Sequence, residues 1–347
     1  MAGGTIRAQR VAGATVDYVV GIDIGGTNVV VGTVSRDGSL LHGLHKEPTR
    51  PEEGPDCAVA RLVGLAHQSI EDTRAEDSEA VILGVGIGSP GPLDRVTGRV
   101  LMTPNLGWNN YPLRDSVREA IAMPASLDND ANCAILGEWW QGAARDTRHA
   151  IGITVGTGIG GGIIIGGRLY HGYSEMAGEL GHTTIDADGR LCKCGNYGCL
   201  EAYASGPAIA RRAVEAIRTG IETTMPDYVD GKLDGLSAHT VYEAARDGDS
   251  LALEVVRETS RLLGTGVANL VNIFNPEIVV VCGGVTMAGT SLFDPLRREV
   301  RRRAFRPAAE ACRIMPGELV GTAGVYGAAR AFLNQVAAGL IEGRADG

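Results

Sequence analysis

Near the start of the chain, hydrophobic residues fall into three short runs that turns separate. Tyr18–Ile24 and Val29–Val34 are apolar runs, and Leu40–His45 follows the turn Ser35–Ser39. Short apolar runs between glycine-rich or polar turns are typical of β-strands joined in a meander. We therefore expect a three-stranded meander here, with the loop Gly25–Asn28 between its first two strands.

The same layout returns in the middle of the chain. His149–Val155 has the pattern of a strand, the glycine-rich stretch Gly156–Gly162 follows, and Ile163–Ile165 and Arg168–Tyr170 resume the β pattern. A repeated arrangement of this kind predicts two related units, each opening with an antiparallel hairpin.

Apolar residues spaced three or four positions apart predict helices between and after these strands. The predicted helices are Asp56–Thr73, Leu113–Ala122, Cys133–Trp140, 207–218, 250–273 and 324–341. The further predicted strands are Ala80–Gly86 and 277–282, and Ile221–Leu236 is predicted to be a surface loop. Alternating strands and helices in a chain of 347 residues indicate an α/β protein of two domains.

The composition argues against nucleic-acid and membrane partners. The 32 basic and 41 acidic side chains give a net charge of −9, whereas nucleic-acid binding needs a concentrated positive surface. The densest basic run, Arg297–Arg303, is predicted to be a solvated helix face. No apolar stretch approaches the ~20 residues that span a bilayer, and the start of the chain lacks a secretory signal. We expect residues 1–16 to be a disordered lead-in.

The loop Gly25–Asn28 has the composition of a phosphate-binding hairpin. Its glycines allow close backbone approach, and its consecutive N–H groups can surround an anion; an ordinary hairpin turn is the alternative. Asp23 ends the buried strand just before it, where Mg²⁺ or its waters would compensate the carboxylate. The three lysines, Lys46, Lys193 and Lys232, do not follow a glycine loop in Walker A spacing, so a P-loop is excluded.

Two segments match the dinucleotide-binding spacing of glycines, Gly86–Gly91 and Gly156–Gly161. That mechanism requires a helix directly after the turn, and neither segment is followed by a helical pattern. By analogy with the first hairpin, we interpret Gly156, Thr157 and Gly158 as a second phosphate-binding hairpin.

Asn129 and Asp130 precede a predicted helix. A carboxylate placed there can accept the proton of an attacking hydroxyl in phosphoryl transfer. On local sequence alone, an ordinary helix cap is the more frequent explanation.

The strongest local signal is a cluster of metal-ligand residue types, His182, Cys192, Cys194 and Cys199. One histidine and three cysteines complete a tetrahedral zinc set and indicate a structural ion; unliganded buried thiols are the alternative. With an odd total of seven cysteines, the cluster favours a reduced, cytoplasmic protein over a disulfide framework.

Two pairs of residues complete the candidate chemistry. Two acids lie beside the metal cluster, and two glycines lie in the last third of the chain. Zinc would fix the neighbouring Glu179 and Glu201 in an arrangement suited to binding several hydroxyls, unless both are ordinary surface acids. Gly283 and Gly284, which follow a buried strand, either open a flat slot for a nucleobase or mark a strand-to-helix turn.

Together these residues resemble the ROK family (repressors, open reading frames, kinases), and specifically its bacterial glucokinases. The resemblance spans about residues 17–335 and rests on Asp23–Asn28, Pro104–Trp108, Asn129–Asn132, Gly156–Gly162, Gly178–His182, Cys192–Glu201 and Cys282–Val285. The chain departs from the family pattern in its lead-in, in Cys133, where a small residue is frequent, and in Asn28, where many relatives carry lysine.

The resemblance implies an α/β, actin-like (ribonuclease H-like) sugar kinase of two domains with a cleft between them. The small domain would cover 17–128 and include a C-terminal helix at about 324–345, and the large domain with the zinc site would cover 129–323. The implied reaction is ATP-dependent phosphorylation of glucose at its 6-hydroxyl, with Mg²⁺, in a homodimer or homotetramer.

The resemblance also implies residue roles. Asp130 would be the general base, and His182 would bind zinc through one ring nitrogen and face the sugar with the other. The implied sugar contacts are Gly91, Asn105, Asn129, Asp130, Glu179, His182 and Glu201. The implied nucleotide contacts are Asp23, Gly25, Gly26, Thr27, Asn28, Thr157, Gly158, Gly283 and Gly284, with adenine at the last two.

Alternatives remain open at this point. The same chemistry could serve N-acetylmannosamine, N-acetylglucosamine, mannose or fructose, and polyphosphate could replace ATP. A sugar-responsive repressor is disfavoured, because about 16 residues before the first strand are too few for a helix-turn-helix. Asp23 and Asp130 argue against a sugar-binding module without turnover.

Overall fold

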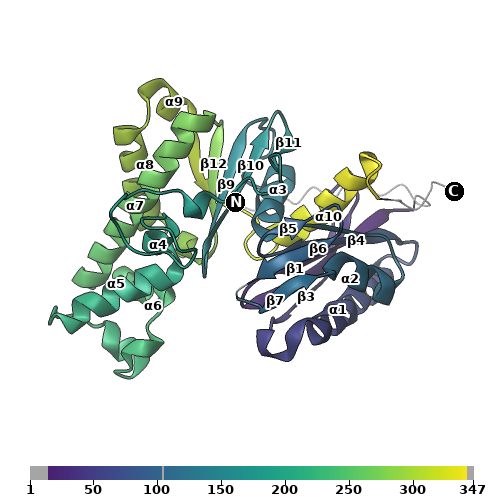
Figure 1. Ribbon diagram of the computed structural model, residues 1–347, viewed down its shortest axis with the longest axis horizontal. Coiled ribbons are helices and arrows are strands. Elements are labelled where there is room, and N and C mark those ends of the chain that lie inside the picture. Colours follow the sequence, from purple (N-terminus) through teal and green to yellow (C-terminus); the bar gives the residue numbers. More distant parts are fainter. Residues whose placement is uncertain (1–14, 104, 342–347) are drawn as a thin grey trace, which may run out of the picture.

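Two five-stranded mixed sheets form the framework of the molecule (Figure 1). The structure, a computed structural model, describes residues 15–103 and 105–341, so the predicted lead-in at 1–16 lies outside them except for its last two residues. The strand orders are β3-β2-β1-β4-β8 and β11-β10-β9-β12-β13. In each sheet the first three strands are antiparallel and the remaining pairs are parallel, so the internal repeat predicted from the sequence is confirmed.

The first sheet follows the predicted meander closely. Its strands are β1 (Asp17–Ile24), β2 (Asn28–Ser35), β3 (Leu41–Pro48), β4 (Val81–Ser89) and β8 (Ala125–Asn129). The helices α1 (Gly54–Glu76) and α2 (Leu113–Ile121) share one apolar core with it. The last helix, α10 (Ala323–Ala337), packs on its other face, where Val325, Ala329 and Phe332 meet Val19 and Val34.

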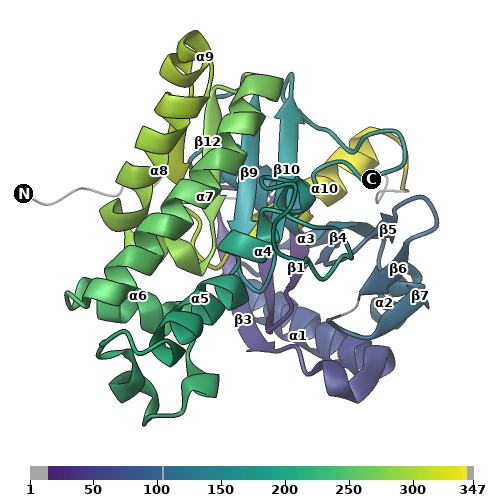
Figure 2. The same cartoon turned by 60° about the vertical axis from the view of Figure 1, so that its left-hand side comes forward.

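The second sheet carries a larger helical layer. Its strands are β9 (Ala150–Val155), β10 (Ile159–Ile165), β11 (Arg168–Leu169), β12 (Ile278–Cys282) and β13 (Arg313–Pro316). The helices beside it are α4 (Glu201–Ala204), α5 (Gly206–Arg218), α6 (Ala238–Arg246), α7 (Ser250–Phe274), α8 (Thr290–Arg303) and α9 (Arg306–Ala311). Their apolar faces form the largest core of the described chain, and Figure 2 shows α7 and α8 running alongside β9 and β12.

Helices α3 (Asp130–Gln141) and α10 connect the two halves, because they pack on each other and each also packs on one sheet. Their contact is close: a Cβ at Gly327 would lie 1.6 Å from the carbonyl oxygen of Cys133. Backbone therefore meets backbone at this crossing. The α/β class and the return of the last helix to the first sheet agree with the sequence analysis, while the domain limits at 128 and 323 stay a prediction.

Several elements differ from the expectation. A third small sheet, β5 (Leu93–Asp94), β6 (Arg99–Thr103) and β7 (Trp108–Tyr111), was not predicted, nor were α6, α9 and β13. The predicted loop Ile221–Leu236 contains two short 3₁₀ turns. Within the described residues, no helix is long and apolar enough to cross a membrane.

The last helix is shorter than the predicted 324–345, since it ends at Ala337. Gly339 adopts a left-handed conformation, with a φ of 68°, and its N–H donates to the carbonyl of Val336. The N–H of Leu340 donates to Gln335. These two bonds form a Schellman motif, which satisfies the last carbonyls and stops the helix.

Candidate active site

A cleft of about 990 Å³ brings the predicted site residues together. Both glycine hairpins, the Asn129–Asp130 pair and residues beside the histidine–cysteine cluster line it. The predicted residues on its walls are Asp23, Gly25, Gly26, Thr27, Asn28, Gly91, Asn105, Asn129, Asp130, Thr157, Gly158, Glu179, His182, Glu201, Gly283 and Gly284.

The two glycine hairpins occupy equivalent positions in the two sheets, Gly25–Asn28 between β1 and β2, and Gly156–Gly158 between β9 and β10. Each is closed by a backbone hydrogen bond of 2.9 Å, from Gly25 to Asn28 and from Gly156 to Gly158. Strand β10 follows the second hairpin directly. The expectation that its glycines do not form a dinucleotide-binding turn is therefore confirmed.

The start of α3 shows how the two neighbours Asn129 and Asp130 are placed. The Asn129 Oδ1 accepts hydrogen bonds from the N–H groups of Ala131, at 2.9 Å, and Asn132, at 3.2 Å. Asn129 is therefore the helix cap, as its residue type favours. The helix begins at Asp130, three residues before the predicted start, and Asp130 lies in its first turn on the wall of the cleft.

Asp23 and Asp130 have strongly perturbed acidity. Burial, and after it the charge of Asp130, raises the pKa of Asp23 to about 7. Burial also raises the pKa of Asp130 to about 6; a hydrogen bond from Ala131 opposes this rise and the charge of Glu179 adds to it. Paired carboxyls with such shifts in a cleft are typical of proton-transfer and metal-assisted sites.

Asp23 lies against the first turn of α10. A Cβ at Gly324 would be 2.2 Å from the Asp23 carboxyl carbon, so only glycine leaves room for the carboxylate here. The first turn of a helix carries a partial positive charge, which favours an anion. The last helix of the chain therefore helps to hold the acid that precedes the first hairpin.

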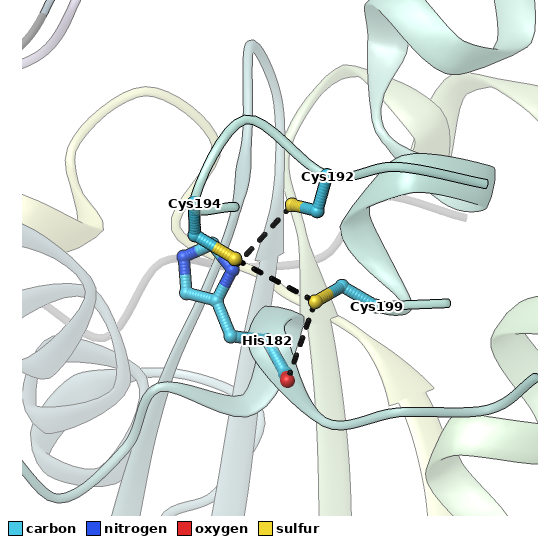
Figure 3. A group of neighbouring side chains, drawn as sticks. All are labelled: His182, Cys192, Cys194 and Cys199. Atoms are coloured by element: carbon cyan, nitrogen blue, oxygen red, sulfur yellow. Dashed lines mark hydrogen bonds between the residues drawn. The ribbon is translucent and has the colours of Figure 1, made fainter. Parts of the chain in front are cut away.

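The metal-ligand cluster assembles as the sequence predicts (Figure 3). One ligand atom from each of His182, Cys192, Cys194 and Cys199 lies within 4.8 Å of the others. The Cys194 and Cys199 sulfurs are 3.7 Å apart, and the Cys192 sulfur is 3.8 Å from the His182 Nδ1. A tetrahedral ion with Zn–S bonds of about 2.3 Å requires sulfur separations of about 3.8 Å. The donor set thus fits zinc.

The two carboxylates beside the metal cluster have different surroundings. The Glu179 Oε2 is 3.9 Å from the His182 Nε2, the ring nitrogen that does not face the sulfurs. The Glu201 Oε2 accepts a 2.8 Å hydrogen bond from the N–H of Ile159, directly after the second hairpin, and its Oε1 is 3.8 Å from the Cys192 sulfur. Glu201 therefore joins the metal cluster to the second hairpin, a link that the sequence analysis did not anticipate.

Gly283 and Gly284 lie in a turn after β12, as one of the two interpretations expected, and the nucleobase slot stays a prediction. Gly283 has a φ of 96° and joins β12 to a 3₁₀ turn, Gly284–Ala288. Both glycines also line the cleft.

The sequence analysis missed several charged residues of the cleft walls. Lys46 and Lys193 line the cleft, as do Arg95, Asp128 and Glu175. Lys46 pairs with Val30 in the sheet, because β3 continues three residues beyond its predicted end. Arg95 lies in the turn of the unpredicted small sheet, where strands as short as two residues leave almost no periodicity to detect.

The fold and the cleft define a class: two related α/β halves of the actin-like type with a ligand site between them. The profile of the ROK family matches residues 19–335, so this chain belongs to the ROK family. Its actin-like sugar-kinase fold is thereby established as well.

Three relatives illustrate the similarity. A glucokinase of Thermotoga maritima is 37% identical, over 90% of this chain and 96% of its own length. The crystal structure of a ROK family glucokinase from Streptomyces griseus with glucose and AMPPNP is 37% identical, with a TM-score of 0.79, and covers 90% of this chain and 98% of that one. A xylose repressor of Caldicellulosiruptor bescii is 33% identical, over 84% of this chain and 71% of its own length.

Proposed function

We propose that this protein transfers the terminal phosphoryl group of ATP to the 6-hydroxyl of glucose. The observation that carries the proposal is the position of Asp130, a buried carboxyl that lines one cleft together with two glycine hairpins and the side chains of Glu179, His182 and Glu201. Glucokinase relatives whose similarity to this protein covers 90% of the chain support the choice of glucose and ATP.

In this mechanism Asp130 accepts the proton of the sugar hydroxyl as the oxygen attacks phosphorus. The hairpins Gly25–Asn28 and Gly156–Gly158 bind the phosphates through their backbone N–H groups. Asn105, Asn129 and Glu179 orient the sugar by hydrogen bonds to its other hydroxyls. Exclusion of water from the cleft favours transfer to the sugar over hydrolysis.

Two metals complete the proposal. Asp23 would hold Mg²⁺ or its waters beside the first hairpin, where the ion neutralises charge on the transferring group. His182, Cys192, Cys194 and Cys199 would hold a closed structural zinc, which fixes the loop that carries Glu179 and Glu201. The homodimeric or homotetrameric state and the cytoplasmic location stay predictions.

The substrate choice is tested with a panel of sugars and donors in a coupled spectrophotometric assay. We expect the highest kcat/KM for glucose with ATP, ahead of mannose, fructose, N-acetylglucosamine and N-acetylmannosamine, and ahead of polyphosphate as donor. If an acetamido sugar gave the highest kcat/KM, the proposed sugar would be wrong, but the proposed phosphoryl transfer would stand. Absence of turnover together with tight, salt-sensitive operator binding would favour a repressor, like the xylose repressor relative.

The role of Asp130 is tested by Asp130→Asn. Loss of the base should lower kcat by about 10³-fold, while calorimetric glucose affinity stays within a few fold. Because the amide removes a buried charge beside Asp23 and Glu179, the melting temperature should be equal or higher. Asp188→Asn, at an exposed position, is the matched control and should change none of these values. Retention of most of kcat in Asp130→Asn would show that another group is the base.

The pH dependence follows from the raised pKa values of the two acids. Protonation of Asp130, with a pKa of about 6, removes the base, and protonation of Asp23, with a pKa of about 7, removes a metal-binding charge. We therefore expect kcat/KM to fall as the pH decreases from 7 through 6, with circular dichroism verifying that the fold persists. An acid limb near pH 4, the ordinary range of carboxyl groups, would contradict this assignment.

Zinc is tested by elemental analysis and one substitution. We expect about one zinc per chain after washing with a weak chelator. Cys194→Ser should lower the zinc content and raise the KM for glucose. Cys57→Ser, which alters an exposed cysteine outside the cluster, should change neither. Full activity of a protein shown to be free of metal would refute the structural role of zinc.

A further inference from the structure

A partly buried network of charges lies in the cleft wall beside Asn129 and Asp130. Its centre is Asp128, the next-to-last residue of β8, whose side chain is only 2% exposed. The Asp128 carboxylate accepts hydrogen bonds from the N–H of Asn129, at 2.8 Å, and from the Asn132 side chain, at 3.3 Å. It therefore also braces the turn from which α3 starts.

Two further side chains reach Asp128 from different parts of the chain. The Arg95 Nε is 3.2 Å from Asp128 Oδ2, and the His171 Nε2 is 3.0 Å from the same oxygen. The Arg95 Nη1 donates a hydrogen bond of 2.5 Å to the Glu175 Oε2. Arg95 belongs to the β5–β6 turn of the first half, whereas His171 and Glu175 belong to the segment that follows β11 in the second half. The network thus ties the two halves together across the cleft.

The charges of this network are strongly interdependent. Although burial opposes its ionisation, the hydrogen bond and charge of His171 and the charge of Arg95 lower the pKa of Asp128. A buried carboxylate that loses its cationic partner is strongly destabilised. Arg95 is the only arginine on the described walls of the cleft, and it contacts both Asp128 and Glu175.

The backbone of the segment 171–178 also requires support. Glu175 has a φ of 64°, in the left-handed region that residues with a side chain avoid, and Gly172 and Gly178 have φ values of 74° and 100°. A residue in this region is strained and persists only where its surroundings impose the conformation. The ion pair with Arg95 is such a constraint. Glu179, a proposed sugar contact, follows this segment directly.

We propose that Arg95 is a positioning residue for the sugar: by pairing with Asp128 and Glu175, it holds the segment 171–178, and with it Glu179, against the sugar half of the cleft. This inference rests on the proposed function, because it concerns the same site. Arg95 acts on sugar binding through its two partners. Its loss should therefore weaken sugar binding and leave the nucleotide half, at the two hairpins, unchanged.

The test compares Arg95→Met with wild type. We expect the KM for glucose, and its calorimetric dissociation constant, to rise at least about tenfold, with the KM for ATP within about twofold and kcat within a few fold. Arg95→Lys keeps the positive charge, but its single ammonium group lacks the two separate nitrogens that contact Asp128 and Glu175. It should therefore restore only part of the glucose affinity. Glu175→Gln, which keeps the shape and removes the charge, should shift glucose affinity in the same direction by a smaller factor.

Arg99→Met is the matched control, because Arg99 lies on the adjacent strand β6, bonds Asn110 and is not among the described residues that line the cleft. It should leave all constants unchanged. A lower melting temperature of Arg95→Met with unchanged glucose affinity, or an equal rise of both KM values, would overturn the inference. If wild type binds glucose but phosphorylates no sugar, the proposed function fails, and the calorimetric comparison still decides the role of Arg95.

Discussion

Two carboxyls, Asp23 and Asp130, are buried beside the same cleft, and the cost of burying both is a constraint on the packing around them. Burial raises the pKa of Asp23 to about 7 and that of Asp130 to about 6, and the charge of Asp130 adds to the rise at Asp23. Both lie at the first turn of a helix, Asp130 in α3 and Asp23 against Gly324 of α10. The partial positive charge of these turns offsets part of the cost. The fold therefore stabilises an acidic pair that would be unfavourable elsewhere in a protein interior.

This constraint explains why α3 and α10 pack so closely. The two helices connect the sheets, and their backbones meet where Gly327 faces the carbonyl of Cys133. A larger residue at this crossing would separate the helices and move the two acids with them. Close packing at this crossing, three residues along each helix from Asp130 and from Gly324, thus positions the two acids, and residues of both halves line the cleft.

Sequence patterns predicted most of the framework because its strands and long helices have strong periodicity. The repeated strand–glycine–strand layout at Gly25–Asn28 and Gly156–Gly162 gave both hairpins, and residue chemistry alone gave the four members of the metal cluster. The small sheet was missed because its strands have two to five residues. With it, Arg95 was missed, since its importance comes from contacts with Asp128 and Glu175, which lie far away in the sequence. Local pattern cannot report such pairings.

The metal cluster and the charge network act on the cleft from opposite sides of Glu179. The cluster holds His182 three residues after it, and the network holds Glu175 four residues before it. A segment fixed at both ends loses little conformational entropy when a ligand binds, because folding has already ordered it. On the other side of the cluster, Glu201 accepts a hydrogen bond from the N–H of Ile159 and so connects the loop that carries the cluster to the second hairpin. A displacement of that loop would therefore alter the proposed sugar and phosphate contacts together, whereas a break at Arg95 would affect the proposed sugar contacts alone.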